Sequence, residues 1–153
     1  MNSYKIAIVG PEESKWNPKQ IFQAKQEIFS ILLANDKNYD VATLVSGRCH
    51  KGGVDIWAEG IAKNLEIQTE IYPAEVHQWT DEIDIDGIKW KGFRSRNIQI
   101  AEACDILYCI VPKTSGKIYC KHCNALGHPT NGGCWTMRHA AMLGKKTELI
   151  IIE

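Results

Sequence analysis

The sequence contains a series of short apolar runs, most of which end at a glycine, a serine or a proline. Their residues are apolar at consecutive positions rather than at alternate ones. This pattern is typical of parallel strands that are buried on both faces, because helices cover both faces of a parallel sheet. The sequence therefore predicts five strands, at residues 4–9, 41–45, 67–72, 105–111 and 147–152.

Stretches with apolar residues near helical spacing separate these strands. In the first stretch, Asn17 and Pro18 are typical of a helix start, since asparagine caps free amide groups and proline fits the first turn. The alternation predicts a single Rossmann-like, doubly wound α/β domain over residues 1–153, with a mainly parallel five-stranded sheet. The helices are expected at about residues 18–34, 55–64, 97–103 and 134–143.

The composition narrows the range of partners and compartments. Lys plus Arg and Asp plus Glu both number 18, so the formal net charge is zero. This balance excludes a strongly basic nucleic-acid coat, although it is compatible with a local basic pocket. No apolar run approaches the roughly 20 residues of a membrane helix, and the N-terminal segment lacks the layout of a signal peptide. We therefore expect a cytoplasmic protein without a membrane partner.

Two segments interrupt the alternation of strands and helices. Residues 74–92 show no clear period, and their Asp86-Gly87 pair predicts the turn of a small hairpin. Residues 113–133 form a cysteine-rich insertion. Trp16, Trp79 and Trp90 lie in predicted loops, where a tryptophan either covers the sheet or stacks on a bound base.

The insertion and its flank predict a metal site. Cys120, Cys123, His128 and Cys134 follow the spacing C-x2-C-x4-H-x5-C, which is close to that of a zinc knuckle. Three thiolates and one imidazole form a closed tetrahedral set, which suits a structural Zn²⁺ ion. His122 is an alternative fourth ligand, and free thiols in a surface loop are the alternative to metal binding.

A second motif lies at residues 46–55, SGRCHKGGVD, between a predicted strand and a predicted helix. Glycines allow backbone amides to approach a ligand closely, and the N-terminus of a helix favours an anion such as phosphate. The segment matches neither a Walker A loop nor the G-x-G-x-x-G fingerprint. A plain connection whose glycines take positive φ angles is the alternative interpretation.

Residues 46–63, SGRCHKGGVDIWAEGIAK, resemble a signature of the SLOG superfamily. This Rossmann-like group includes the LOG cytokinin-activating phosphoribohydrolases and the core of DNA-processing protein A. Residues 91–105, with their Arg96-Asn97 pair, and residues 132–145, which begin with Gly-Gly and end with Gly-Lys, are similar to two further motifs of the group. Together with residues 6–10, the resemblance covers nearly the whole chain.

The resemblance implies a nucleotide or nucleotide-derived ligand at the carboxyl ends of the strands. Backbone amides and Lys51 would neutralise its phosphate, and Arg96 would add a charge-assisted contact. Asp55 would accept a hydrogen bond from a ribose hydroxyl or, alternatively, cap its own helix. The implied ligand-binding residues are Gly10, Ser46, Gly47, Lys51, Gly52, Gly53, Asn97, Gly132, Gly133 and Thr136.

The same resemblance leaves catalysis open. LOG-type hydrolases carry a glutamate in the last of these motifs, where it assists cleavage of an N-glycosidic bond, but Met137 stands at that position here. The candidate catalytic residues are Arg96, which would orient phosphate or ribose, and a carboxylate such as Glu59, Asp55 or Glu12. Two hypotheses follow: a phosphoribohydrolase-like N-glycosidase, or a sensor module that binds a nucleotide and cleaves nothing.

A third hypothesis concerns nucleic acid. Tyr119 and Trp135 flank the predicted metal ligands, and a zinc knuckle can bind single-stranded nucleic acid by stacking bases on such rings. The neutral net charge disfavours this hypothesis. SLOG proteins are often dimers or larger, so we expect a homo-oligomer by analogy alone.

Overall fold

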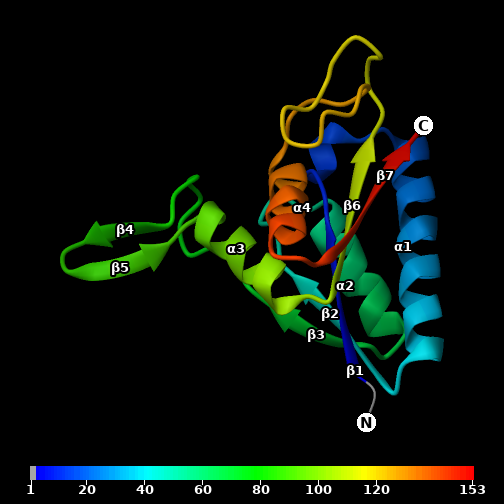
Figure 1. Ribbon diagram of the computed structural model, residues 1–153, viewed down its shortest axis with the longest axis horizontal. Coiled ribbons are helices and arrows are strands. Elements are labelled where there is room, and N and C mark those ends of the chain that lie inside the picture. The colour runs from blue at the N-terminus through cyan, green and yellow to red at the C-terminus, as the bar shows by residue number, and fades with distance from the viewer. Residues whose placement is uncertain (1–2) are drawn as a thin grey trace.

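Five parallel strands form the centre of the protein, and the computed structural model describes residues 3–153 of the chain (Figure 1). The strands are β1 (Ser3–Val9), β2 (Val41–Ser46), β3 (Gln68–Ile71), β6 (Ile106–Pro112) and β7 (Lys146–Ile152). They lie in the order β3-β2-β1-β6-β7, and every neighbouring pair is parallel. This arrangement confirms the predicted doubly wound α/β fold, since the chain starts in the middle of the sheet and extends it to both sides.

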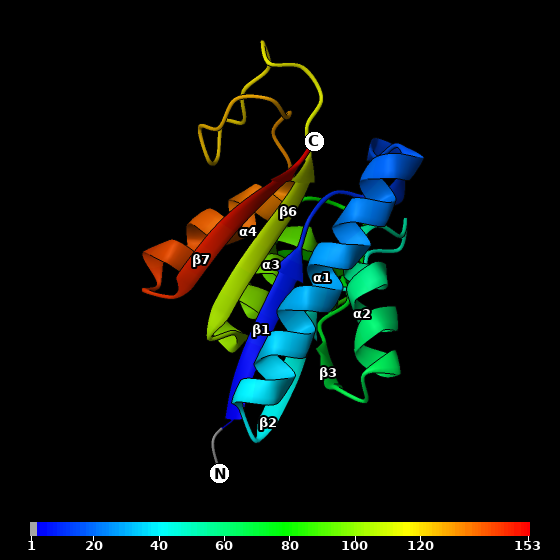
Figure 2. The same ribbon diagram turned by 90° about the vertical axis from the view of Figure 1, so that its right-hand side faces the viewer.

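Helices cover both faces of the sheet. Helices α1 (Pro18–Asn38) and α2 (Val54–Asn64) lie on one face, and α3 (Phe93–Ala103) and α4 (Gly132–Met142) lie on the other (Figure 1, Figure 2). Successive residues of β1 point to opposite faces. Ile6 and Ile8 pack in the core cluster under α1 and α2, whereas Ala7 and Val9 pack in the cluster under α3 and α4. Both faces are buried, which explains why the strand is apolar at consecutive positions.

The helix boundaries differ from the predicted ones in identifiable ways. The side chain of Asn17 accepts a hydrogen bond from the amide of Gln20 at 2.8 Å, which confirms the predicted start of α1. Helix α3 begins at Phe93 rather than at residue 97. The sequence-based prediction missed its first turn, because this turn carries two arginines and shows no apolar period. Helix α4 begins before Cys134, because the side chain of Asn131 accepts a hydrogen bond from the amide of that cysteine at 3.1 Å.

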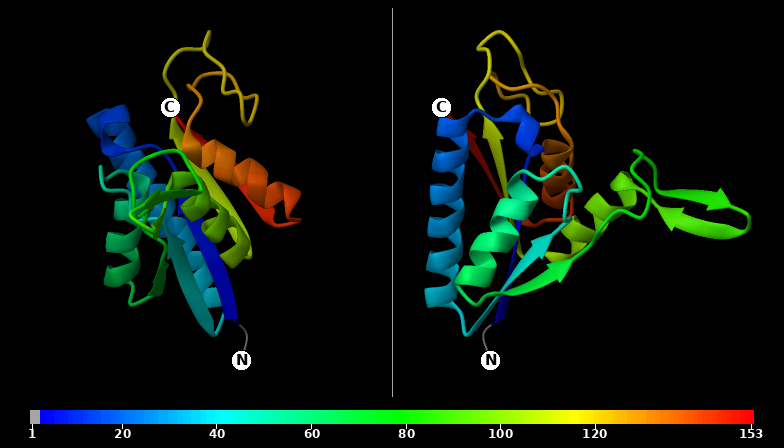
Figure 3. Two further views of the ribbon diagram at one scale, coloured as in Figure 1. Left: turned by 90° about the vertical axis from the view of Figure 1, so that its left-hand side faces the viewer. Right: turned by 180° about the vertical axis from the view of Figure 1, so that it is seen from behind.

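The predicted hairpin is present and projects from the domain (Figure 1, Figure 3). It consists of β4 (Glu82–Ile85) and β5 (Ile88–Lys91), and Asp86 and Gly87 form its turn with φ angles of 53° and 82°. Two residues with positive φ in the turn match the right-handed twist of the strands. At the base of the hairpin, Arg94 Nη1 contacts both carboxylate oxygens of Asp81 at 2.7 Å, so the hairpin is tied to α3.

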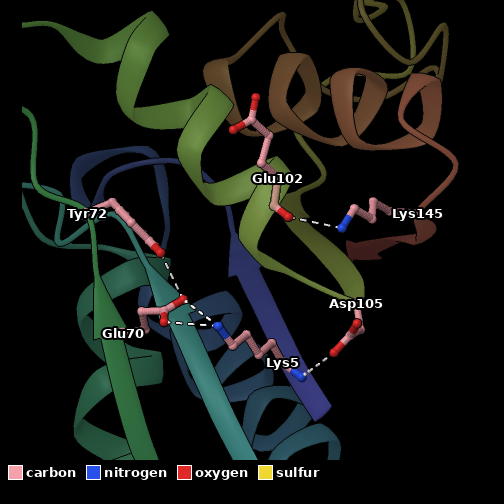
Figure 4. A network of polar contacts seen from close by, with 6 residues as sticks. All are labelled: Lys5, Glu70, Tyr72, Glu102, Asp105 and Lys145. Carbon is pink, nitrogen blue, oxygen red and sulfur yellow. Dashed lines mark hydrogen bonds and ion pairs between the residues drawn. The ribbon is translucent and has the colours of Figure 1, made fainter.

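A network of polar contacts joins distant segments across the α3 side of the sheet (Figure 4). The ammonium of Lys5 on β1 reaches across β2 to Glu70 on β3, with Nζ and Oε1 3.1 Å apart. The backbone amide of Lys5 donates to the carboxylate of Asp105 at 2.8 Å. Lys145 Nζ donates to the carbonyl oxygen of Glu102 at the end of α3. These contacts hold the loops before β6 and β7 against the sheet.

Within residues 3–153, no helix combines the length and apolarity that crossing a membrane requires.

Two glycines provide a matched test of this packing. A Cβ atom on Gly10, at the end of β1, would meet the carbonyl oxygen of Ile110 and the side chain of Val54, whereas a Cβ atom on Gly60 in α2 would have nothing within 4 Å. We expect Gly10→Ala to lower the free energy of unfolding by about 1–3 kcal/mol through overpacking. Gly60→Ala should raise it by about 0.5–1 kcal/mol, because alanine is the better helix former. Urea denaturation measures both values, and equal stabilities for the two variants would contradict the packing at Gly10.

Candidate functional site

A pocket of about 520 Å³ lies beyond the carboxyl ends of β1 and β6. Ligands of doubly wound α/β proteins bind at this edge of the sheet, where the strand order reverses. Four segments contribute to its walls: the loop after β1, the loop between β2 and α2, helix α3, and the stretch from residue 128 into α4. The pocket therefore brings together residues that are far apart in the sequence.

Many of the predicted binding residues line this pocket. Lys51 and Arg96, on which the sequence-based interpretation depends, both line this pocket. The predicted residues that line it are Gly10, Lys51, Asp55, Arg96, Asn97, Gly132, Gly133 and Thr136, whereas Ser46, Gly47, Gly52, Gly53 and Glu59 do not.

The residues outside the lining have other contacts. The Ser46 hydroxyl donates to Glu59 Oε2 at 2.8 Å, and Arg48 Nε lies 3.0 Å from Glu59 Oε1. Both carboxylate oxygens of Glu59 are therefore engaged away from the pocket. Gly47 lets the Arg96 side chain approach the backbone closely, because a Cβ atom at this position would lie 2.6 Å from Arg96 Nη1. Gly53 has a φ angle of 90°, and a Cβ atom on it would meet the carbonyl oxygen of Pro11.

Arg96 and Asn97 form the buried polar part of the α3 wall. Arg96 Nη1 donates to the carbonyl oxygen of Gly47 at 2.7 Å, and its Nε donates to Asn97 Oδ1 at 2.8 Å. Asn97 is only 7% exposed. Its Nδ2 donor has no hydrogen-bond partner among residues 3–153 and faces the start of α4, where a Cβ atom on Gly132 would lie 3.7 Å away. Within the described residues every buried side-chain nitrogen and oxygen has a partner, so this donor is accessible from the pocket, where it is suited to an acceptor on a ligand.

Asp55 brings a buried carboxyl group to the same pocket. Its Oδ2 accepts a hydrogen bond from the amide of Cys49 at 3.2 Å, so it fixes the loop before α2. The alternative that Asp55 caps its own helix is wrong, since Gly53 is the cap residue and no side chain caps that end. Burial raises the pKa of Asp55 to about 6, and the nearby charge of Arg96 opposes this rise. A carboxyl group with this pKa exists in both protonation states near neutral pH.

Aromatic side chains form another part of the pocket lining. Phe93, Trp79 and His50 line the pocket, and the His50 ring stacks on His77 with centroids 3.6 Å apart. Trp79 packs edge-on against Trp135 of α4, with centroids 5.0 Å apart. Planar faces at the side of a pocket can hold a planar ring. Trp79 comes from the interruption at residues 74–92, Phe93 from the start of α3 and His50 from the loop after β2, so three separate segments supply these rings.

Three side chains of the insertion and Cys134 of α4 converge beside the pocket, which His128 also lines. The ligand atoms of Cys120, Cys123, His128 and Cys134 all lie within 4.8 Å of one another, so this group can hold a metal ion. Cys123 Sγ lies 3.3 Å from His128 Nε2. His122 is not part of the group, which decides between the two predicted histidines in favour of His128. The spacing in the sequence predicted this cluster correctly.

Other pocket residues escaped sequence reasoning. Asn131 lines the pocket and caps α4, and an asparagine directly before Gly132-Gly133 at a helix start is a signal that could have identified it. Lys15 and Phe93 carried no such signal, because only the folded chain places them at this edge. His139 stacks on Trp135 and lies outside the pocket lining.

The metal group can be tested with Co²⁺ as a spectroscopic probe. We expect the protein to bind one Co²⁺ ion with the strong thiolate-to-cobalt absorption of a tetrahedral site. Cys123→Ser should weaken binding by more than about tenfold, because one thiolate ligand is lost. Cys49→Ser, which changes a cysteine outside the group, is the control and should bind as the wild type does. Equal affinity of both variants would show that the cluster is not the metal site.

A scan against protein-family models finds no match to this sequence, and a search of curated proteins finds none either. Among solved structures, the chain is similar to the molybdenum cofactor carrier protein from Chlamydomonas reinhardtii, with a TM-score of 0.56 and 18% sequence identity. The similarity covers 96% of this chain and 76% of that protein. At this level of identity the similarity shows a common fold.

Proposed function

We propose that this protein binds a nucleotide or a nucleotide-like anionic metabolite in the pocket beyond β1 and β6, as expected of a SLOG-type protein. The observation that carries the proposal is the Nδ2 donor of Asn97: the residue is largely buried, yet this donor has no partner among residues 3–153, is accessible from the pocket and lies beside the glycine start of α4. It supplies a donor where the helix already favours an anion.

The start of α4 suits a phosphate group. The first amide groups of a helix have no acceptor within the helix, and Gly132 and Gly133 carry no side chain that would block access to theirs. Asn97 Nδ2 adds a third donor, and Lys15, Lys51 and Arg96 add positive charge to the lining. Donors from a helix end and from a fixed amide form a preorganised oxyanion site.

The remainder of the pocket suits a flat ring and a sugar. Its volume of about 520 Å³ lies within the usual range for small-molecule sites, and Phe93, Trp79 and His50 offer faces for stacking. The carboxylate of Asp55 offers an acceptor for a hydroxyl. The similar solved structure is named as a cofactor carrier protein, which agrees with binding as the primary role of this fold here.

Zn²⁺ is the ion that the metal group suits best. Three thiolates and an imidazole are the ligand set of structural zinc sites, and four protein ligands leave no open position for a reacting water molecule. The ion would thus shape the wall that contains His128 and would take no part in chemistry. Elemental analysis of the purified protein distinguishes zinc from iron or copper.

The phosphate site predicts a specific loss in a variant of Asn97. Asn97→Asp keeps the oxygen that accepts from Arg96 Nε but replaces the free donor with a negative charge. We expect the affinity for adenosine monophosphate (AMP), measured by calorimetry, to fall by more than about tenfold. Gln99→Glu makes the same charge change on α3 outside the pocket lining and should leave the affinity within about twofold. Unchanged binding by Asn97→Asp would refute this assignment.

The raised pKa of Asp55 favours a second candidate function, hydrolysis of an N-glycosidic bond. Near neutral pH the protonated carboxyl can donate its proton to the departing base as the C–N bond breaks. A water molecule attacks the anomeric carbon and leaves its hydroxyl on the sugar, and its other proton restores the carboxyl group. Arg96 would orient the ribose phosphate. Glu12 and Asp55 line the pocket, whereas Glu59 is the weakest candidate of the three predicted carboxylates. Ser46 and Arg48 hold Glu59 outside the pocket lining.

Release of adenine from AMP, followed by chromatography, tests this activity. If Asp55 is the acid, the rate should fall as pH rises through about 6, because the protonated form is lost. Asp55→Asn should lower the rate by about 100-fold or more, whereas Glu59→Gln should keep it within about tenfold. Binding of AMP without release of adenine would contradict the hydrolase and leave the binding protein.

A further inference from the structure

One short segment, residues 128–134, belongs to both the metal group and the pocket. His128 at its start and Cys134 at its end are two of the four candidate metal ligands. His128, residues 129–131, Gly132 and Gly133 all line the pocket. Because the metal ligands and the pocket wall share one segment, they cannot move independently. Metal binding at the group therefore affects the conformation of the pocket wall.

Asn131 connects the two sites through both ends of its side chain. Its Oδ1 accepts a hydrogen bond from the amide of Cys134 at 3.1 Å and so caps α4. Its Nδ2 donates to Cys134 Sγ at 3.5 Å and to the carbonyl oxygen of Pro129 at 3.3 Å. A cysteine binds a metal as the thiolate, which is a stronger acceptor than the thiol. A bound metal therefore strengthens the contact that holds Asn131 and the first turn of α4.

The insertion has few buried side chains that could fix this turn. The buried side chains among residues 113–131 are Cys120 and His128, and both belong to the metal group. The rest of the segment is held by backbone hydrogen bonds, a few side-chain hydrogen bonds and one isolated β-bridge between Tyr119 and Leu126. The core of this segment thus consists of metal ligands instead of apolar side chains, as in small domains that fold around an ion.

We infer that a metal ion held by Cys120, Cys123, His128 and Cys134 and an anion in the pocket bind cooperatively, with Asn131 as the positioning residue that couples them. The inference rests on the proposed function, because it takes the pocket to hold an anionic ligand. The coupling is reciprocal: the metal raises the affinity for the anion, and the anion raises the affinity for the metal by the same factor. The metal ion thereby regulates the affinity of the pocket for the anion.

Two titrations measure this coupling, with Zn²⁺ and AMP as the probes. In the first, calorimetry gives the affinity for AMP of the zinc-loaded and of the chelator-treated protein. We expect removal of zinc to lower this affinity by on the order of tenfold or more. In the second, a chromophoric chelator competes for the bound zinc with and without saturating AMP. AMP should raise the affinity for zinc by the same factor.

The outcomes separate this inference from the proposed function. Equal affinity of both forms for AMP overturns the coupling and leaves the pocket assignment intact. Binding of AMP to neither form overturns the proposed function and this inference with it. If the metal-free chain unfolds, the chelator competition decides, because it starts from the folded, zinc-loaded protein: an unchanged affinity for zinc at saturating AMP overturns the coupling.

A variant of Asn131 tests the role of that residue. Asn131→Ser keeps an oxygen that can cap α4 but removes the Nδ2 donor to Cys134 Sγ. We expect this variant to bind zinc, with AMP changing the affinity for zinc by less than about twofold. Asn38→Ser makes the same substitution at the end of α1, outside the metal group and the pocket lining, and should keep the full coupling. Full coupling in Asn131→Ser would overturn the assignment of Asn131.

Discussion

Main chain meets main chain at the carboxyl end of β1, and the rest of the structure depends on this contact. A Cβ atom on Gly10 would meet the carbonyl oxygen of Ile110, and one on Gly133 would lie 3.1 Å from the Cα atom of Gly10. Gly53 likewise approaches the carbonyl oxygen of Pro11. Because no side chains intervene, the first turns of α2 and α4 reach the edge of the sheet. The pocket is the space that these converging backbones leave open.

The polar groups of the pocket divide into those that build it and those that remain available. Arg96 donates hydrogen bonds to the carbonyl oxygen of Gly47 and to Asn97 Oδ1, so it fixes the loop after β2 to α3. Asp55 fixes the same loop through the amide of Cys49. Asn97 Nδ2 and the glycine start of α4 remain open to the pocket. A rigid frame with a few open donors suits recognition of an anion, since little reorganisation accompanies binding.

Much of the site could be predicted from the sequence where chemistry and spacing were both local. The four candidate metal ligands lie within 15 consecutive residues, and their spacing was sufficient to predict that they would come together. Ser46 and Glu59 show the limit of this reasoning. Both belong to a glycine-rich motif, yet their side chains form a hydrogen bond with each other and lie outside the pocket lining. A motif gives residue types in order, but the direction of each side chain depends on the backbone path and on its neighbours.

The sequence by itself determined the parallel sheet, the helices on both faces, the hairpin turn and the candidate metal ligands, because apolar periodicity, turn residues and ligand spacing are local properties of the chain. Only the tertiary structure decided that Asp55 lines the pocket and Glu59 does not, that Trp79 and Phe93 both line it, and that Asn131 joins the candidate metal group to α4. These features depend on contacts between segments that lie far apart along the chain. Such contacts form only when the sheet brings the loops to one edge.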